Sequence, residues 1–119
     1  MHEINTAILL IRLSVGFTMV CFGLSQFINP HTWLGYIPKW LELLMPMKST
    51  SFMREHAAGN FVLGVLFMIG VWPVVTAWIV AGWWLSILPF ALRYDRYIGL
   101  RDVCIICATI AVIVLHHAV

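Results

Sequence analysis

Long apolar stretches, separated by short polar connectors, constrain the fold of this chain more than any other feature. Hydrophobic residues make up 62% of its 119 residues and charged residues only 10%, whereas soluble domains carry roughly 45–50% and about 25%. Because so short a chain cannot bury this much apolar surface away from water, its expected solvent is a bilayer. The sequence predicts one all-α domain over residues 1–119, an integral membrane four-helix bundle with spans at about 7–28, 55–72, 74–92 and 98–116.

The first span is expected to be a retained membrane helix. It is near the ~20 residues that cross a ~30 Å hydrocarbon core, is long for the apolar region of a signal peptide, and has no obvious small-residue cleavage site. Gly16 and Gly23 fall on one of its faces, and Gly59 and Gly64 recur in the second span. Glycine at such positions lets a neighbouring helix approach closely, so these faces are expected to be packing surfaces.

A shorter element, at about residues 33–46, lies between the first two spans and is too short to cross a membrane. Pro38 is acceptable as the first residue of a short helix. Because tryptophan prefers headgroup depth, we expect a short interfacial helix here, with a re-entrant lid over the bundle as the alternative. Its apolar residues repeat at helical intervals: Trp33, Leu34, Ile37, Trp40, Leu41 and Leu44.

The distribution of basic residues predicts the orientation in the membrane. One side of the expected bundle carries six of them and the other side only Arg12. Because Lys and Arg concentrate on the cytoplasmic side, both termini are expected to be periplasmic or otherwise extracytoplasmic. A net charge of +2 without a basic helix face excludes a nucleic-acid partner. The six residues are Lys39, Lys48, Arg54, Arg93, Arg96 and Arg101.

Polar side chains at the expected cytoplasmic ends of the spans are the candidate ligand-binding residues. Arg101 and Asp102 point about 100° apart on a helix, so we expect Arg101 to pair with Glu55, and Asp102 with Arg93 or Arg54. A cavity lined by such groups could hold a quinone head group, a phosphate or a small anion. The alternative is a set of interfacial ion pairs that fix the topology. The cluster comprises Gln26, Arg54, Glu55, His56, Asn60, Arg101 and Asp102.

Cys104 and Cys107 form a C-x-x-C pair at the start of the last span and are the candidate redox thiols. At a helix N-terminus, the dipole and the neighbouring Arg101 favour the nucleophilic thiolate. Apolar surroundings and a reducing cytoplasm weigh against a dithiol site, and cysteine is also an ordinary small apolar residue. Cys21 lies at a comparable expected depth, but no fourth ligand is suitably placed, so no metal site is predicted.

Arg12 is the remaining candidate ligand-binding residue, and it lies on the opposite side of the expected membrane. It has no acidic partner at its own depth in the sequence. We expect its long side chain to snorkel and to bind helix carbonyls or lipid phosphate. His116 and His117 end the chain on the same side, and without further ligands they do not form a metal site.

Several stretches, in order along most of the chain, carry a family resemblance. They are Arg12-Leu13 with Gly16, the run from Phe22 to Phe27 followed by Asn29-Pro30, the run from Trp33 to Leu41, Gly64 with Gly70, and Arg101-Asp102. Together they resemble the DoxX family of small four-helix bacterial membrane proteins. Members often carry an acidic residue early in the second helix, where Asn60 stands here, and the C-x-x-C pair is not a family signature.

The resemblance implies a protein of the bacterial inner membrane. Some members are linked to quinone-dependent sulfur oxidation or to membrane oxidoreductase complexes. An accessory or partner subunit of a quinone-linked redox system is therefore implied, with quinone as the candidate cofactor, and whether the chain is itself an enzyme stays open. The alternatives are a non-catalytic scaffold that self-associates through its glycine faces, and an oligomeric small-solute carrier with Arg12 and Asn60 lining a path.

The expected orientation predicts that a cysteine in place of Lys48 is reached only from the cytoplasm. In a background without the native cysteines, a membrane-impermeant maleimide should not label Lys48→Cys in intact cells, and labelling should follow when the inner membrane is opened. His2→Cys, at the expected periplasmic terminus, is the control and should react in intact cells. Labelling of Lys48→Cys in intact cells would overturn the orientation.

Overall fold

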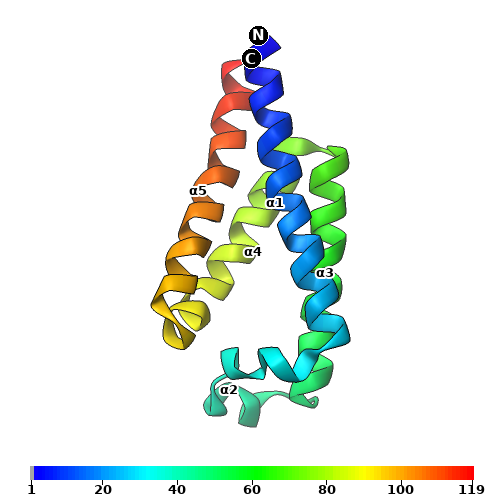
Figure 1. Ribbon diagram of the computed structural model, residues 1–119, viewed down its shortest axis with the longest axis vertical. Helices are drawn as coiled ribbons and strands as arrows, with labels where there is room; N and C mark the ends of the chain where they lie inside the picture. Colours follow the sequence, from blue (N-terminus) through cyan, green and yellow to red (C-terminus); the bar gives the residue numbers. More distant parts are fainter. Residues whose placement is uncertain (1) are drawn as a thin grey trace.

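The computed structural model describes residues 2–119, and helices make up most of this length (Figure 1). In chain order the elements are α1 (His2–Ile28), the 3-10 helix η1 (Pro30–Tyr36), α2 (Lys39–Leu44), α3 (Ser49–Ile69), α4 (Pro73–Tyr94) and α5 (Arg96–Ala118). Residues 2–119 contain no strand, which confirms the all-α prediction.

Three of the helices, α1, α4 and α5, are long and apolar enough to cross a membrane. Only 28% to 33% of the residues in their apolar windows are buried inside the protein. Helices that turn most of their apolar side chains outward need an apolar solvent, so the described chain has the character of a membrane protein. The first half of α3 is more polar, because it carries Arg54, Glu55 and His56.

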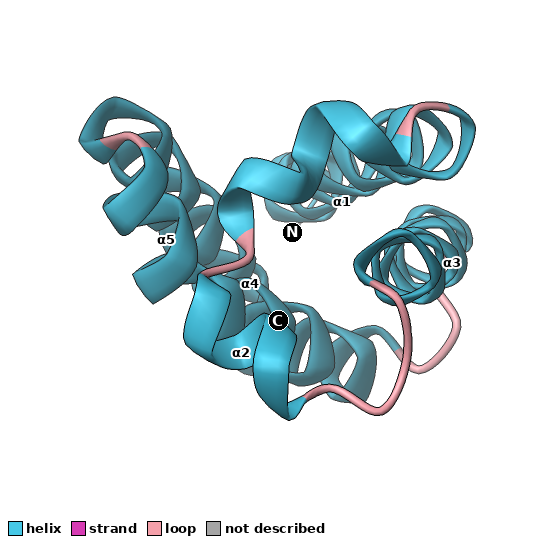
Figure 2. Cartoon of the chain, turned by 90° about the horizontal axis from the view of Figure 1, so that it is seen from below, coloured by secondary structure: helices cyan, strands magenta, loops and turns pink. Residues whose placement is uncertain are grey.

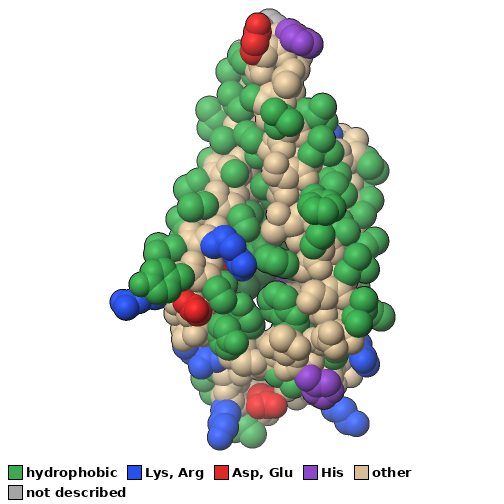
Figure 3. Space-filling view, in the orientation of Figure 1, with side chains coloured by type: hydrophobic (Ala, Val, Ile, Leu, Met, Phe, Trp, Pro, Cys, Tyr) green, Lys and Arg blue, Asp and Glu red, His purple; other side chains and the backbone are tan. Residues whose placement is uncertain are grey.

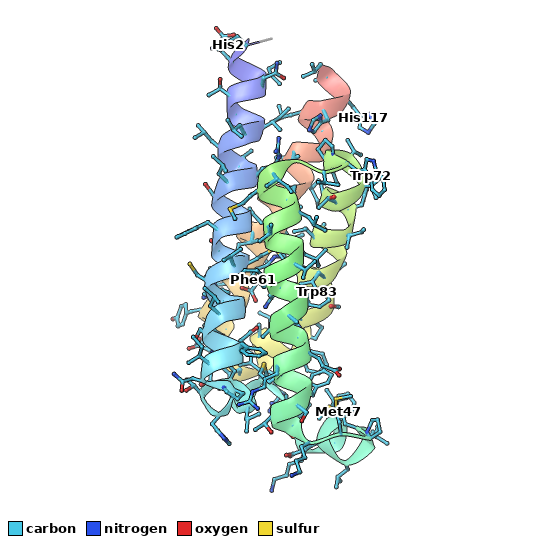
Figure 4. The ribbon with its side chains drawn as sticks, turned by 90° about the vertical axis from the view of Figure 1, so that its right-hand side faces the viewer. His2, Met47, Phe61, Trp72, Trp83 and His117 are labelled. Atoms are coloured by element: carbon cyan, nitrogen blue, oxygen red, sulfur yellow. The ribbon has the colours of Figure 1, made fainter. Side chains whose placement is uncertain are left out.

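The long helices pack as two close pairs, α1 with α3 and α4 with α5, and the contact of α1 with α5 joins the pairs. Figure 4 shows His2, Trp72 and His117 toward one end of the molecule and Met47 at the other. Seen from below in Figure 2, η1 and α2 cross this second end. The interior between the pairs is filled by fully buried side chains, among them Met19, Phe67, Val80 and Val112.

Glycines determine how closely α1 and α3 approach. A Cβ added to Gly64 would lie 2.7 Å from the carbonyl oxygen of Gly16, and one added to Gly16 would lie 2.6 Å from that of Gly64. At Gly23, a Cβ would lie 2.8 Å from the carbonyl oxygen of Ala57. Backbone atoms cannot move aside as a flexible side chain can, so this packing requires the absence of a side chain. The expected glycine packing surfaces are therefore present at these positions.

The side chain of Arg12 caps the C-terminal end of α3. Its Nε donates to the carbonyl oxygen of Phe67 at 3.0 Å and its Nη2 to that of Met68 at 3.1 Å. These carbonyls belong to the last turn of α3, which has no further helical donors and carries the negative end of the helix dipole. The helix ends at Gly70, whose left-handed φ of 83° suits glycine. Of the two expected roles for Arg12, the structure shows the binding of helix carbonyls.

The short element expected at about residues 33–46 consists of two short helices, η1 and α2. η1 already begins at Pro30, and the chain is extended at Ile37, with φ −93° and ψ 113°. Pro38 precedes α2 as its cap instead of being its first residue. The physical reason is that a proline ring disfavours helical backbone at the residue before it, which interrupts the helix at Ile37.

α1, α4 and α5 cover the expected apolar ranges, whereas α3 ends at Ile69 and not at the expected residue 72. α1 begins at His2 rather than near residue 7, and α3 begins at Ser49 rather than near residue 55. Hydropathy marks only the apolar part of a helix, whereas backbone hydrogen bonding continues through polar first turns. The polar residues at the start of α3 are therefore part of a helix, and the helix determines the positions of their Cβ atoms.

The glycine contacts predict a clear difference between two substitutions in helices. Gly64→Ala should lower the free energy of unfolding by about 1–3 kcal/mol, because the added methyl group forces α1 and α3 apart. Gly82→Ala is the matched control, since a Cβ at Gly82 would meet no atom within 4 Å, and it should be neutral or stabilising by up to about 1 kcal/mol. Unfolding in mixed detergent micelles measures both values. Equal values for the two variants would contradict the close α1–α3 contact.

Candidate functional site

A cavity of about 60 Å³ lies among the long helices at the end covered by η1. Most of the Lys and Arg side chains visible in Figure 3 lie toward this end, and the flanks above it are mainly hydrophobic. Every long helix contributes to the lining. The lining residues are Phe22 and Gln26 of α1, Trp33 and Tyr36 of η1, Met53, His56 and Asn60 of α3, Trp84 and Ile87 of α4, and Arg101 and Asp102 of α5.

A chain of hydrogen bonds joins α1, α3 and α4 beside this cavity. Nε1 of Trp83 donates to Oδ1 of Asn60 at 2.7 Å, and Nδ2 of Asn60 donates to Oε1 of Gln26 at 2.8 Å. An indole N–H can only donate, so Trp83 determines the orientation of both amides. Gln26 is 6% exposed and lines the cavity, and its Nε2 has no hydrogen-bond partner within residues 2–119. One amide donor is therefore left for an occupant of the cavity.

Arg101 and Asp102 pair with each other. Nε and Nη2 of Arg101 donate to Oδ1 of Asp102 at 3.2 and 3.0 Å. The guanidinium group of Arg101 also lies over the ring of Phe22, with its Cζ atom 4.8 Å from the ring centroid. The side chain of Asp102 is 2% exposed and that of Arg101 is 44% exposed. Oδ2 of Asp102 accepts no hydrogen bond from the described chain, so it remains available to an occupant of the cavity.

The expected partners of this pair were wrong. Arg54 and Glu55 are exposed, and Nε of Arg54 lies 3.4 Å from the carbonyl oxygen of Phe27. Arg93 donates elsewhere, to the carbonyl oxygen of Gly35. The difference of about 100° applies to the Cα–Cβ directions of adjacent residues, but the long arginine side chain bends back far enough to reach its neighbour.

His56 lies where the cavity meets a second space. Its ring stacks on that of Trp83, with centroids 4.8 Å apart and planes 12° from parallel. Figure 4 shows Trp83 alongside α3. Within residues 2–119 the imidazole makes no hydrogen bond, so either ring nitrogen can serve as donor or acceptor, according to its tautomer, toward a ligand.

Aromatic rings form the wall of the cavity under η1. The ring centroid of Phe22 lies 5.6 Å from that of Trp33 and 6.2 Å from that of Trp84. Trp33 is oriented by a hydrogen bond from its Nε1 to Oγ of Ser25 at 3.1 Å. Nε1 of Trp84 is buried and has no partner in the described chain. These rings make this side of the cavity flat and apolar.

The C-terminal end of η1 is fixed to the end of α4. Nη2 of Arg93 donates to the carbonyl oxygen of Gly35 at 3.0 Å. The ring of Tyr36 stacks on that of Tyr94, with the ring centroids 4.3 Å apart. Burial raises the pKa of Tyr36, and the nearby Arg101 only partly opposes this shift. The Tyr36 hydroxyl group therefore stays protonated at neutral pH and can donate a hydrogen bond.

An apolar groove of about 230 Å³ adjoins the cavity. It is bounded by η1, α4 and α3 and by Leu41 of α2, and its polar side chains are Tyr36, His56 and Ser86. Four residues line both spaces, so the cavity and the groove are direct neighbours. The groove is lined by Tyr36, Ile37, Leu41, Phe52, Met53, His56, Ser86, Ile87 and Phe90, of which Tyr36, Met53, His56 and Ile87 are shared.

The structure brings together five of the eight candidate ligand-binding residues: Gln26, His56, Asn60, Arg101 and Asp102 line the cavity. Arg54 and Glu55 are exposed and lie outside its lining, and Arg12 caps α3 at the other end.

The thiols of Cys21, Cys104 and Cys107 are free and exposed on the helix surfaces. They are therefore not part of the cavity lining. The described residues include no group of three His, Cys, Asp or Glu side chains that could hold a metal ion.

The aromatic side chains of the site were missed at the level of sequence. Trp33 was expected at the membrane interface, and Trp83 and Trp84 were not assigned a role. The available signal was Asn60, because an amide inside an apolar helix needs a partner and an indole N–H is a suitable donor. In comparisons with known proteins, no family model, no curated protein and no solved structure matches the chain.

The hydrogen-bond chain predicts the effect of removing its first donor. Trp83→Phe keeps a ring against His56 but leaves Oδ1 of Asn60 without a partner, and should lower the free energy of unfolding by about 0.5–2 kcal/mol. Trp78→Phe is the control on the same helix, since Trp78 is 60% exposed, and should change stability less. Unfolding in mixed micelles measures both values. A loss in Trp83→Phe no larger than in the control would contradict the role of this bond.

Proposed function

We propose that the chain is a protein of the bacterial inner membrane in which α1, α3, α4 and α5 all cross the bilayer. Its support is that α3 packs against α1, one of the three membrane-competent helices. Four crossings return the chain to its starting side, and the two termini lie close together in Figure 1. In this arrangement η1 and α2 lie at the cytoplasmic interface, where Lys39 and Lys48 meet lipid phosphates and Trp40 meets the headgroup region.

Within this membrane, the function that the site supports best is the binding of a quinone-type ligand. The observation that carries it is that a small cavity with amide and charged side chains in its lining adjoins an apolar groove. A lipid-soluble quinone has the matching form, a planar ring with polar oxygen atoms and an apolar tail. Few membrane ligands combine these parts, so the pairing of the two spaces favours this class over phosphate or a small anion.

In this proposal the ring of the ligand lies in the groove. A cavity of about 150 Å³ holds benzene, so the inner cavity of about 60 Å³ is too small for a ring, whereas the groove of about 230 Å³ is large enough. The ring therefore sits at the junction between Tyr36 and His56, with one oxygen atom in the inner cavity and the tail along Leu41 and Phe90. The chain's own residues bind and orient the ring and exclude water from one of its oxygen atoms.

The biological role that we assign is that of an accessory or partner subunit of a quinone-linked membrane redox system, in line with the DoxX resemblance. The second candidate is a scaffold, which is favoured by an apolar hollow of about 270 Å³ on the outer face of α1 and α3, formed in part by Gly23, Ala57 and Ala58. The carrier has less support, because fully buried side chains such as Met19 and Phe67 fill the protein between Asn60 and Arg12.

Filling the junction predicts a loss of ligand binding. Ile87→Trp places a large ring where the two spaces meet and should weaken binding of a decyl-substituted benzoquinone at least about tenfold. Ile79→Trp, at a half-exposed position on the same helix, is the control and should bind as the native protein does. Isothermal titration calorimetry of protein in lipid nanodiscs gives the dissociation constants. Unchanged binding in Ile87→Trp, or none in the native protein, would contradict the proposed site.

A further inference from the structure

Besides the indole N–H of Trp84, the lining of the inner cavity holds an amide donor and a carboxylate acceptor that no described residue uses. The amide donor is Nε2 of Gln26, whose Oε1 is occupied by Asn60. The acceptor is Oδ2 of Asp102, whose Oδ1 takes both hydrogen bonds from Arg101. Both side chains are more than nine-tenths buried and line the same cavity. Because buried polar groups need partners, the unused pair specifies the chemistry of the occupant.

The charge state of Asp102 follows from its partner. The guanidinium of Arg101 is always charged and donates through two nitrogen atoms to one carboxyl oxygen. The ion pair at 3.0 Å stabilises the ionised carboxylate, and an ionised carboxylate can only accept hydrogen bonds. Oδ2 therefore needs a donor from the ligand, whereas Nε2 of Gln26 needs an acceptor.

The oxidised and the reduced form of a quinone ring differ in whether their oxygen atoms can donate a hydrogen bond. A carbonyl oxygen only accepts, so beside Oδ2 of Asp102 it would leave two acceptors facing each other in a buried space. A phenolic hydroxyl group donates through its hydrogen and accepts through its lone pairs. It can satisfy Asp102 and Gln26 together. His56 does not discriminate between the two forms, because a neutral imidazole can donate or accept.

We infer that this cavity binds the reduced, hydroxyl-bearing form of the ring in preference to the oxidised form. The inference rests on the proposed function, which makes a quinone-type ring the ligand, and adds the redox form that the site selects. Tighter binding of the reduced form makes the bound ring easier to reduce. A tenfold preference raises the midpoint potential of the bound two-electron couple by about 30 mV.

Three matched ligands test the inference on the native protein. Isothermal titration calorimetry in nanodiscs, without oxygen, compares a decyl-substituted hydroquinone, its dimethyl ether and the corresponding quinone. The hydroquinone should bind at least about tenfold tighter than the quinone, and the ether, which has no donor, should lose the same factor. A quinone that binds as tightly as the hydroquinone, or more tightly, overturns the inference alone. No binding of any of the three overturns the proposed function, and the inference with it.

Two amide variants locate the preference. Asp102→Asn can turn its amide donor toward a carbonyl, so the ratio of the two dissociation constants should fall from at least about tenfold to near unity. Glu55→Gln is the matched control, because Glu55 is exposed outside the cavity lining, and should keep the native ratio. An undiminished preference in Asp102→Asn overturns the assignment to this carboxylate. If Asp102→Asn does not fold, the three ligands on the native protein decide.

Discussion

The indole N–H of Trp83 can only donate a hydrogen bond, and the polarity of the buried site follows from this constraint. Because Trp83 donates to Asn60, Asn60 must donate to Gln26, and the remaining donor of Gln26 belongs to the cavity. In apolar surroundings each bond left unmade is costly, so these three side chains hold α1, α3 and α4 in one register. The same bonds that join the helices therefore determine which groups meet a ligand.

Glycine residues, which have no side chain, make this chain of hydrogen bonds possible. Gly23 lies against the backbone of α3 at Ala57, and Gln26 and Asn60 follow these two residues one turn later on the same faces. The close approach of α1 and α3 thus brings the two amides within hydrogen-bond distance. Gly59 acts in the same way for α4, because a Cβ there would overlap the ring of Trp83. A polar site inside an apolar protein is in this way positioned by its smallest residues.

The sequence predicted the helices and part of the site. Long apolar runs were sufficient for the helices, and the polar interruptions brought Gln26, Asn60 and Asp102 into one cluster. The aromatic wall could not be predicted, because hydropathy does not show whether a ring such as that of Trp84 turns inward or toward lipid. The pairing of Arg101 was missed because helical spacing gives the direction of Cβ and not the end of a long side chain. The division of the segment between η1 and α2 could have been predicted from Pro38, because a proline disfavours helical backbone at the residue before it, here Ile37.

The most direct test of a quinone site is the quinone content of the native protein in its own membrane. Protein extracted with its surrounding lipid into polymer-bounded discs, without added ligand, can be analysed by mass spectrometry for quinone per chain and for the ratio of quinone to lipid. A cavity and groove that bind this ligand should retain about one quinone per chain at saturation, at a ratio to lipid well above that of the bulk membrane. A ratio equal to that of the bulk membrane would contradict the site.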